Sequence, residues 1–189
     1  MLHFVAIAPW SDEAVSTKVR QMALPKIEAL GAIEASIIDD TGFPEKGKHS
    51  GGVARQYCGQ PGKQDNCQAA VSLSISNHHA SLPIAHRLYL PQTWADDLDR
   101  RKTAQIPEDI VFKTKPQIAL DQMRAAHAGG IPLGTVLADA GYGYDSQFRD
   151  GMTKLGLLYA VGIQSNVLMW KADATLPVLR LGSDDEEAA

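Results

Sequence analysis

The sequence has 189 residues, of which 44 % are hydrophobic and 21 % are charged, the balance of one ordinary globular domain rather than of a disordered chain. Its 22 Asp and Glu residues outnumber 18 Lys and Arg residues, for a net charge of -4, which argues against a uniformly basic nucleic-acid-binding domain. No apolar run reaches the roughly 18 residues that cross a bilayer, and the first residues lack the features of a signal peptide, so we expect a cytoplasmic protein without a membrane partner.

The first predicted element is an amphipathic helix within residues 1–30, which we interpret as an N-terminal helical segment. Ser11, followed by two acidic residues, is typical of a helix start. A kink or break is expected at Pro25. We expect the apolar residues that recur at near-helical spacing to pack against the rest of the protein. These residues are Val15, Val19, Met22, Ile27 and Leu30.

Four extended segments follow. Residues 33–39 are mostly apolar and stop at the sequence DDTG, which predicts a buried strand that ends in acid. Residues 53–58 and 66–76 flank the turn GQPGKQ and predict a hairpin, and residues 82–90 predict a fourth strand. The polar stretch WADDLDRRK after it has the character of a surface excursion.

From Pro116 onward the pattern alternates between helix and strand. It predicts a helix that ends at Gly129, a short buried strand at 136–138 followed by Asp139, a helix at 146–155 and a strand in LLYAVGI. Because crossover helices must pack on the faces of the sheet, we expect an α/β fold in which a three-strand antiparallel meander precedes alternating helices and parallel strands. Residues 171–189 predict an irregular acidic tail.

Two aspartates carry the main functional signal, since Asp39 and Asp139 each end an apolar strand, where ligand sites of α/β sheets lie. On adjacent parallel strands their carboxylates would be about 4.8 Å apart, which suits Mg²⁺ or Mn²⁺ bound by oxygen ligands. Local roles as turn or helix-cap residues also explain each Asp. Asp40 is an alternative to Asp39, because the two point to opposite faces of a strand and the pattern alone does not choose between them.

Five longer segments carry a more specific pattern: IIDDTGFPEKGKHS, GVARQYCGQPGKQDNCQAAVSLS, ASLPIAHRLYLP, FKTKPQIAL and VLADAGYG. Together they resemble the catalytic domain of bacterial insertion-sequence transposases in the DDE superfamily endonuclease group. The resemblance implies an RNase H-like fold over residues 31–170, whose first and fourth core strands lie side by side and deliver Asp39 and Asp139 as metal ligands. It also implies two-metal cleavage and strand transfer of DNA at transposon terminal repeats, with Mg²⁺ or Mn²⁺ as cofactor.

One feature of that family is not matched. The family places a third carboxylate, a Glu, on a helix after the last core strand, whereas Glu186 and Glu187 stand in a segment without an apolar helical face. We therefore expect a catalytic domain that is incomplete at its C-terminus and inactive alone. The alternative is a non-catalytic remnant that binds DNA ends or protein partners, either intact transposase subunits or a second copy. A haloacid dehalogenase-type phosphatase fits less well, because DDTG lacks an Asp two residues after the first.

Other residues have weaker signals. Lys46, Lys48 and Arg55 follow the first acidic pair and would be placed to meet DNA phosphates, although a solvated loop explains them better. Gly143 in DAGYG is better explained by a tight turn than by close approach of DNA. Trp94 is expected to pack in a core rather than to stack on bases.

Overall fold

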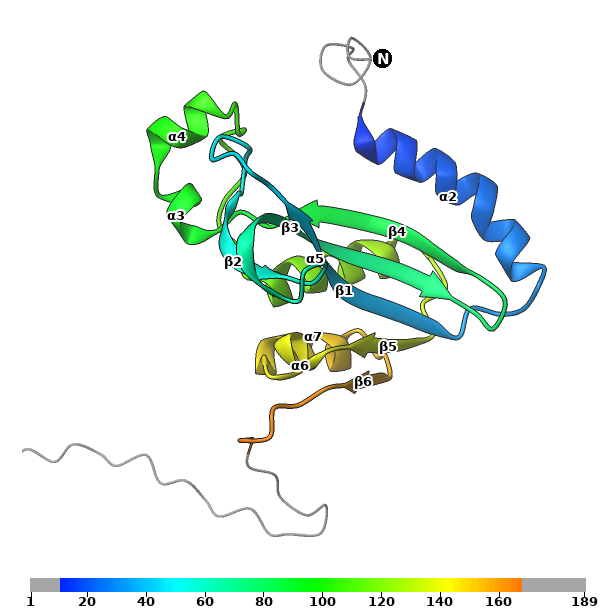
Figure 1. Ribbon diagram of the computed structural model, residues 1–189. Coiled ribbons are helices and arrows are strands. Elements are labelled where there is room, and N and C mark those ends of the chain that lie inside the picture. The colour runs from blue at the N-terminus through cyan, green and yellow to red at the C-terminus, as the bar shows by residue number, and fades with distance from the viewer. Residues whose placement is uncertain (1–10, 168–189) are drawn as a thin grey trace, which may run out of the picture.

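The structure, a computed structural model, describes residues 11–167 (Figure 1). The predicted acidic tail at 171–189, with Glu186 and Glu187, lies outside the described residues. No helix in the described part is long and apolar enough to cross a membrane.

The strands form one mixed sheet of six, in the order β2-β3-β1-β5-β6, with β4 also paired to β3. Pairing of β3 with β1, β2 and β4 is antiparallel, whereas β5 pairs in parallel with both β1 and β6. The expected mixed α/β sheet, with an antiparallel part followed by parallel strands, is therefore confirmed. The strands are β1 (Ala35–Pro44), β2 (Ala54–Cys58), β3 (Lys63–Ser76), β4 (Ser81–Leu88), β5 (Thr135–Ala138) and β6 (Tyr159–Val161).

Six helices lie in the described part of the chain: α2 (Asp12–Glu28), α3 (Gln92–Ala95), α4 (Leu98–Thr103), α5 (Lys115–Ala128), α6 (Ala140–Gly143) and α7 (Ser146–Lys154). The helix α5 has a complete capping box, in which Thr114 and Gln117 exchange side-chain and backbone hydrogen bonds. Pro116 follows at a position where a helix needs no backbone donor. These local signals fix where α5 begins.

The prediction that the first strand stops at Asp39 was wrong. β1 continues to Pro44, because beyond Asp40 it still pairs with β3, from Thr41 opposite Ala70 onward. Only its parallel pairing with β5 ends here, at Ile38 opposite Ala138. The two acidic residues of β1 therefore lie inside a long strand, at the level where its shorter neighbour ends.

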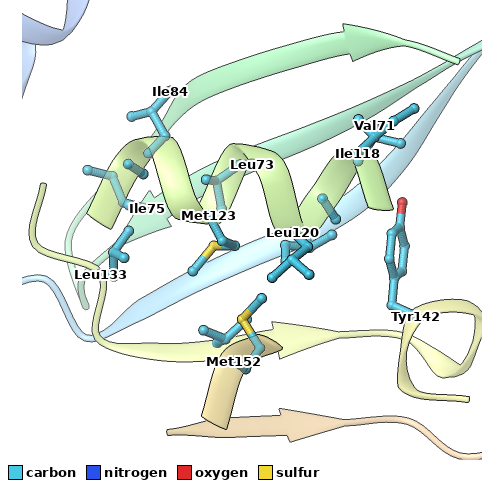
Figure 2. Packing of buried hydrophobic residues seen from close by; sticks show 14 of the residues in the cluster. Val71, Leu73, Ile75, Ile84, Ile118, Leu120, Met123, Leu133, Tyr142 and Met152 are labelled. Carbon is cyan, nitrogen blue, oxygen red and sulfur yellow. The ribbon is translucent and has the colours of Figure 1, made fainter. Parts of the chain in front are cut away.

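The main core lies on one side of the sheet, between the strands and the helices α5 and α7 (Figure 2). β1 contributes Ile38 to this side, and the hydroxyl of Ser36 donates to the carbonyl of Leu133 at 2.6 Å. Its largest fully buried side chains, each under 2 % exposed, are Leu73, Ile75, Met123, Phe148 and Met152. Burial of this kind stabilises the fold by roughly 25 cal/mol per Å² of apolar surface.

The helix α2 differs from its prediction in two ways. It runs through Pro25 without a break, and most of its expected core stripe is exposed, with Val15, Val19 and Met22 at 48 %, 47 % and 60 %. Of that stripe only Ile27 is buried within the helix, which meets the body of the protein at β4 and also packs the partly buried Ala23 and Leu24 against the core. Periodicity identified the helix but not the face that packs.

The predicted surface excursion after β4 is a small second core. Trp94 on α3 is fully buried with Val53 and Leu90, and its indole Nε1 donates to the carbonyl of Val53 at 2.7 Å. The guanidinium of Arg100 lies 3.6 Å from the ring centroid of this tryptophan, a favourable cation–π arrangement. The expectation that Trp94 packs in a core is confirmed.

Candidate metal centre

Asp39 and Asp139 occupy neighbouring positions on the face of the sheet opposite the main core. The register of β1 and β5 pairs Ile37 with Leu137 and Ile38 with Ala138, so the next position brings Asp39 level with Asp139. Ile37 and Leu137 are 37 % and 38 % exposed, and alternation along the strands puts both aspartates on that same open face. Both line a hollow of about 550 Å³, which Asp40 lines as well, and a second hollow of about 280 Å³ is lined by Asp40 and Asp139 but not by Asp39.

Each of these carboxylates has one oxygen held by local backbone. Oδ1 of Asp39 accepts from the amide of Asp40 at 2.7 Å, and Oδ1 of Asp139 accepts from the amide of Gly141 at 2.8 Å and that of Tyr142 at 3.4 Å. Asp139 is thus also the N-cap of α6, which is the helix-cap role that its sequence position suggested as an alternative. The Oδ2 atoms of both aspartates accept no hydrogen bond from any residue within 11–167 and remain open to a cation.

Asp40 is in a different position, on the covered side of the sheet. Its Oδ2 accepts from the ammonium of Lys115 at 2.6 Å, and its Oδ1 accepts from the hydroxyl of Tyr142. Both of its carboxylate oxygens are therefore occupied by side chains of α5 and α6. Asp39 carries no such partner in the described part of the chain, so the two candidates left open by the sequence differ in their contacts.

The hydroxyl of Tyr142 is buried beside Asp40. Burial raises the pKa of its hydroxyl above the ordinary value, and the charge of Asp40 and its hydrogen bond raise it further. Asp139 and Asp39 add smaller contributions in the same direction. All three carboxylates are thus near one buried hydroxyl, which stays protonated and acts as a donor.

Comparison with known proteins gives the family. The family model described as DDE superfamily endonuclease matches residues 1–181. The chain belongs to this family. A curated relative, the probable transposase for insertion sequence element IS701 of Microchaete diplosiphon, is 30 % identical over 165 residues, which are 87 % of this chain and 40 % of the relative. The chain therefore spans two fifths of that relative's length, and no solved structure matches it.

Membership of the DDE superfamily confirms the resemblance drawn from the five segments, and the mixed sheet agrees with the RNase H-like fold that it implied. The parallel pairing of β1 with β5 is the neighbour relationship expected for the two strands that carry the first two acids. Enzymes of this superfamily generally depend on a divalent metal ion.

The side chains of this DDE domain fit such an ion in part. Mg²⁺ and Mn²⁺ prefer oxygen ligands, and Mg²⁺ is commonly held by one or two carboxylates while it keeps several waters. Asp39 and Asp139 offer that pair, each with an open oxygen. Within residues 11–167 no group of three or more His, Cys, Asp or Glu side chains is arranged to hold a metal, so the candidate ligands in this part of the chain are these two.

The basic residues expected near DNA are not part of the hollow. Lys46, Lys48 and Arg55 are exposed and are not among the residues that line it, which on the β2 side are Tyr57, Gly59 and Gln60. None of the three side chains forms an ion pair within the described residues. Their role in contacting phosphate stays a prediction.

Sequence reasoning missed Lys115 and Tyr142, the two residues that hold Asp40. The only sequence signals were their positions, Lys115 at the first turn of a well-capped helix and Tyr142 three residues after the acid in DAGYG. The neighbouring Gly143 is required by packing, since a Cβ atom there would lie 2.0 Å from the carbonyl oxygen of Gly162. This supports the interpretation of that glycine as a structural one.

Proposed function

We propose that this chain supplies two metal-binding carboxylates, Asp39 and Asp139, for DNA cleavage and strand transfer at the ends of an insertion sequence. The observation that carries the proposal is the parallel register of β1 and β5, which aligns the two acids on an open face with one uncommitted oxygen each. Family membership supports the reaction class. The terminal repeats of the element are the proposed DNA substrate, and the bacterial cytoplasm, where that DNA lies, is the proposed location.

The chemistry follows from the ligand set. A bound divalent ion lowers the pKa of a water or 3′ hydroxyl and stabilises the leaving oxygen. Asp39 and Asp139 bind and orient that ion, and the amides of Gly141 and Tyr142 hold the Asp139 carboxylate in place. Because two carboxylates leave most of the coordination sphere to water, phosphate oxygens of DNA complete it.

The charge of the chain makes this metal bridge important for DNA binding. With a net charge of -4, the chain gains little from releasing the counterions of DNA, the usual source of non-specific affinity. A divalent ion held by Asp39 and Asp139 would offset this negative charge beside the DNA backbone. We therefore expect DNA and metal to bind cooperatively.

A titration of Mn²⁺ followed by electron paramagnetic resonance, with and without duplex DNA that carries the element's own terminal sequence, tests this proposal. Terminal DNA should tighten Mn²⁺ binding about tenfold or more, and by linkage Mn²⁺ should tighten DNA binding by the same factor. Asp39→Asn and Asp139→Asn should each abolish the coupling, and Asp109→Asn, an exposed acid outside the hollow, should not. Equal Mn²⁺ affinity with and without DNA would contradict the proposal.

A further inference from the structure

Tyr142 contacts acidic residues from both central strands. Its side-chain hydroxyl donates to Oδ1 of Asp40 on β1, and its backbone amide lies 3.4 Å from Oδ1 and 3.2 Å from the carbonyl oxygen of Asp139. The two acids are far apart in the sequence. One residue therefore joins the loop that carries Asp139 to the strand that carries Asp39 and Asp40.

The ring of Tyr142 is held firmly. It is only 2 % exposed and belongs to the main core, where its centroid lies 5.9 Å from that of Phe148. In Figure 2 the ring stands at one end of the core, and its hydroxyl points toward the end of α5 that carries Ile118. A rigid, buried ring fixes the distance between its backbone and its hydroxyl, so it acts as a spacer between α6 and β1.

Lys115 holds Asp40 from the other side. Its ammonium lies 2.6 Å from Oδ2 of Asp40 and 5.5 Å from the ring centroid of Tyr89. Asp40 is thus fixed between α5 and α6, with one donor from each helix. The raised pKa of Tyr142 agrees with this arrangement, because it keeps the hydroxyl available as a donor.

We propose that Tyr142 is a positioning residue, which uses Asp40 as an anchor on β1 to hold the carboxylate of Asp139 level with that of Asp39. Asp40 is then the fixed point of the site and not a metal ligand. The inference rests on the proposed function in one respect, that Asp39 and Asp139 share the ion. It predicts that removal of the Tyr142 hydroxyl loosens the carboxylate of Asp139, although the hydroxyl does not contact that carboxylate.

Hydrogen exchange of the Gly141 and Tyr142 amides, measured by nuclear magnetic resonance on the full chain without metal, tests the positioning role directly. In Tyr142→Phe both amides should exchange about tenfold faster or more, because their bonds to Asp139 lose the anchor, while amides of α5 keep their protection. Tyr144→Phe is the matched control, since Tyr144 lies in the same segment and is 61 % exposed. Asp40→Asn keeps the shape of the anchor and should give a smaller change in the same direction. Unchanged exchange in both Tyr142→Phe and Asp40→Asn would overturn the inference.

A second readout links this role to the ion. Tyr142→Phe should raise the dissociation constant for Mn²⁺ about threefold to tenfold, since outer contacts that orient a ligand carry effects of this order. Lys115→Arg should restore most of the affinity that Lys115→Met loses. Mn²⁺ affinity unchanged in Tyr142→Phe would also overturn the inference. A parent chain that binds no Mn²⁺ would count against the proposed function alone, because the amide exchange still decides the role of Tyr142.

Discussion

The hydroxyl of Tyr142 donates a hydrogen bond to the carboxylate of Asp40, a residue 102 positions earlier in the chain. The bond connects α6 to β1 inside the protein, at the level where β5 ends, and Asp39 and Asp139 occupy neighbouring positions on the opposite face of the sheet. Buried bonds to a charged acceptor contribute about 1.5 to 3 kcal/mol. This contact therefore has consequences for both stability and the candidate metal centre.

Alkaline pH should destabilise the protein through Tyr142. Its pKa is raised in the folded state, so above the unfolded value of about 10 the unfolded chain has released a proton that the folded chain still holds. The free energy of unfolding should consequently fall by up to about 1.4 kcal/mol per pH unit from this group. Urea unfolding between pH 8 and 11 measures the slope, which should be shallower in Tyr142→Phe. An equal slope in both proteins would show that the hydroxyl titrates normally.

The two aspartates of β1 should differ in how much stability is lost when their charge is removed. Asp40→Asn weakens the bonds to Lys115 and Tyr142 and should lower the free energy of unfolding by about 1 to 2 kcal/mol, a value discounted because the ion pair is partly exposed. Asp39→Asn should change it by less than about 0.5 kcal/mol, as at other exposed positions. Chemical denaturation compares them, and a larger loss in Asp39→Asn would mean that the two roles have been assigned the wrong way round.

A methyl group at Gly143 should also destabilise the site. The new Cβ would meet the carbonyl oxygen of Gly162 at 2.0 Å and the side chain of Val161 at 2.9 Å, and backbone cannot move aside as a flexible side chain can. Overpacking of this kind costs about 1 to 3 kcal/mol or more. Thermal unfolding of Gly143→Ala measures it, beside Gly47→Ala, where a Cβ meets nothing within 4 Å. Equal melting temperatures would contradict this packing.

The sequence predicted most of the helices and strands. It was less successful in predicting how far a strand extends and which face of a helix packs against the rest of the protein. Apolar period and turn residues predicted β3, β5 and α5 to within a few residues, because these patterns follow from local geometry. They did not predict that β1 continues past its aspartates, since that length is set by pairing with β3, whose own sequence is far away. Likewise, the spacing of Val15 and Val19 predicted a helix, but it did not predict that this helix packs against β4.

The candidate site could also be predicted only in part from the sequence. Asp39 and Asp139 could be proposed from the sequence because an acid after an apolar strand is a local signal. The donors that hold Asp40, on α5 and α6, are supplied only by tertiary structure. Lys115 and Tyr142 were missed for that reason, as the pairs that define their roles are 75 and 102 residues apart.

The most direct measurement is the anomalous diffraction of Mn²⁺ in crystals of the chain soaked with an excess of the ion, since two carboxylates bind it only weakly. The account predicts a peak on the open face of the sheet, with an oxygen of Asp39 and an oxygen of Asp139 both about 2.0 to 2.2 Å from the ion and with Lys115 still paired to Asp40. A peak on Asp40 and Asp139 with Lys115 displaced, or no peak beside Asp39 and Asp139, would contradict it.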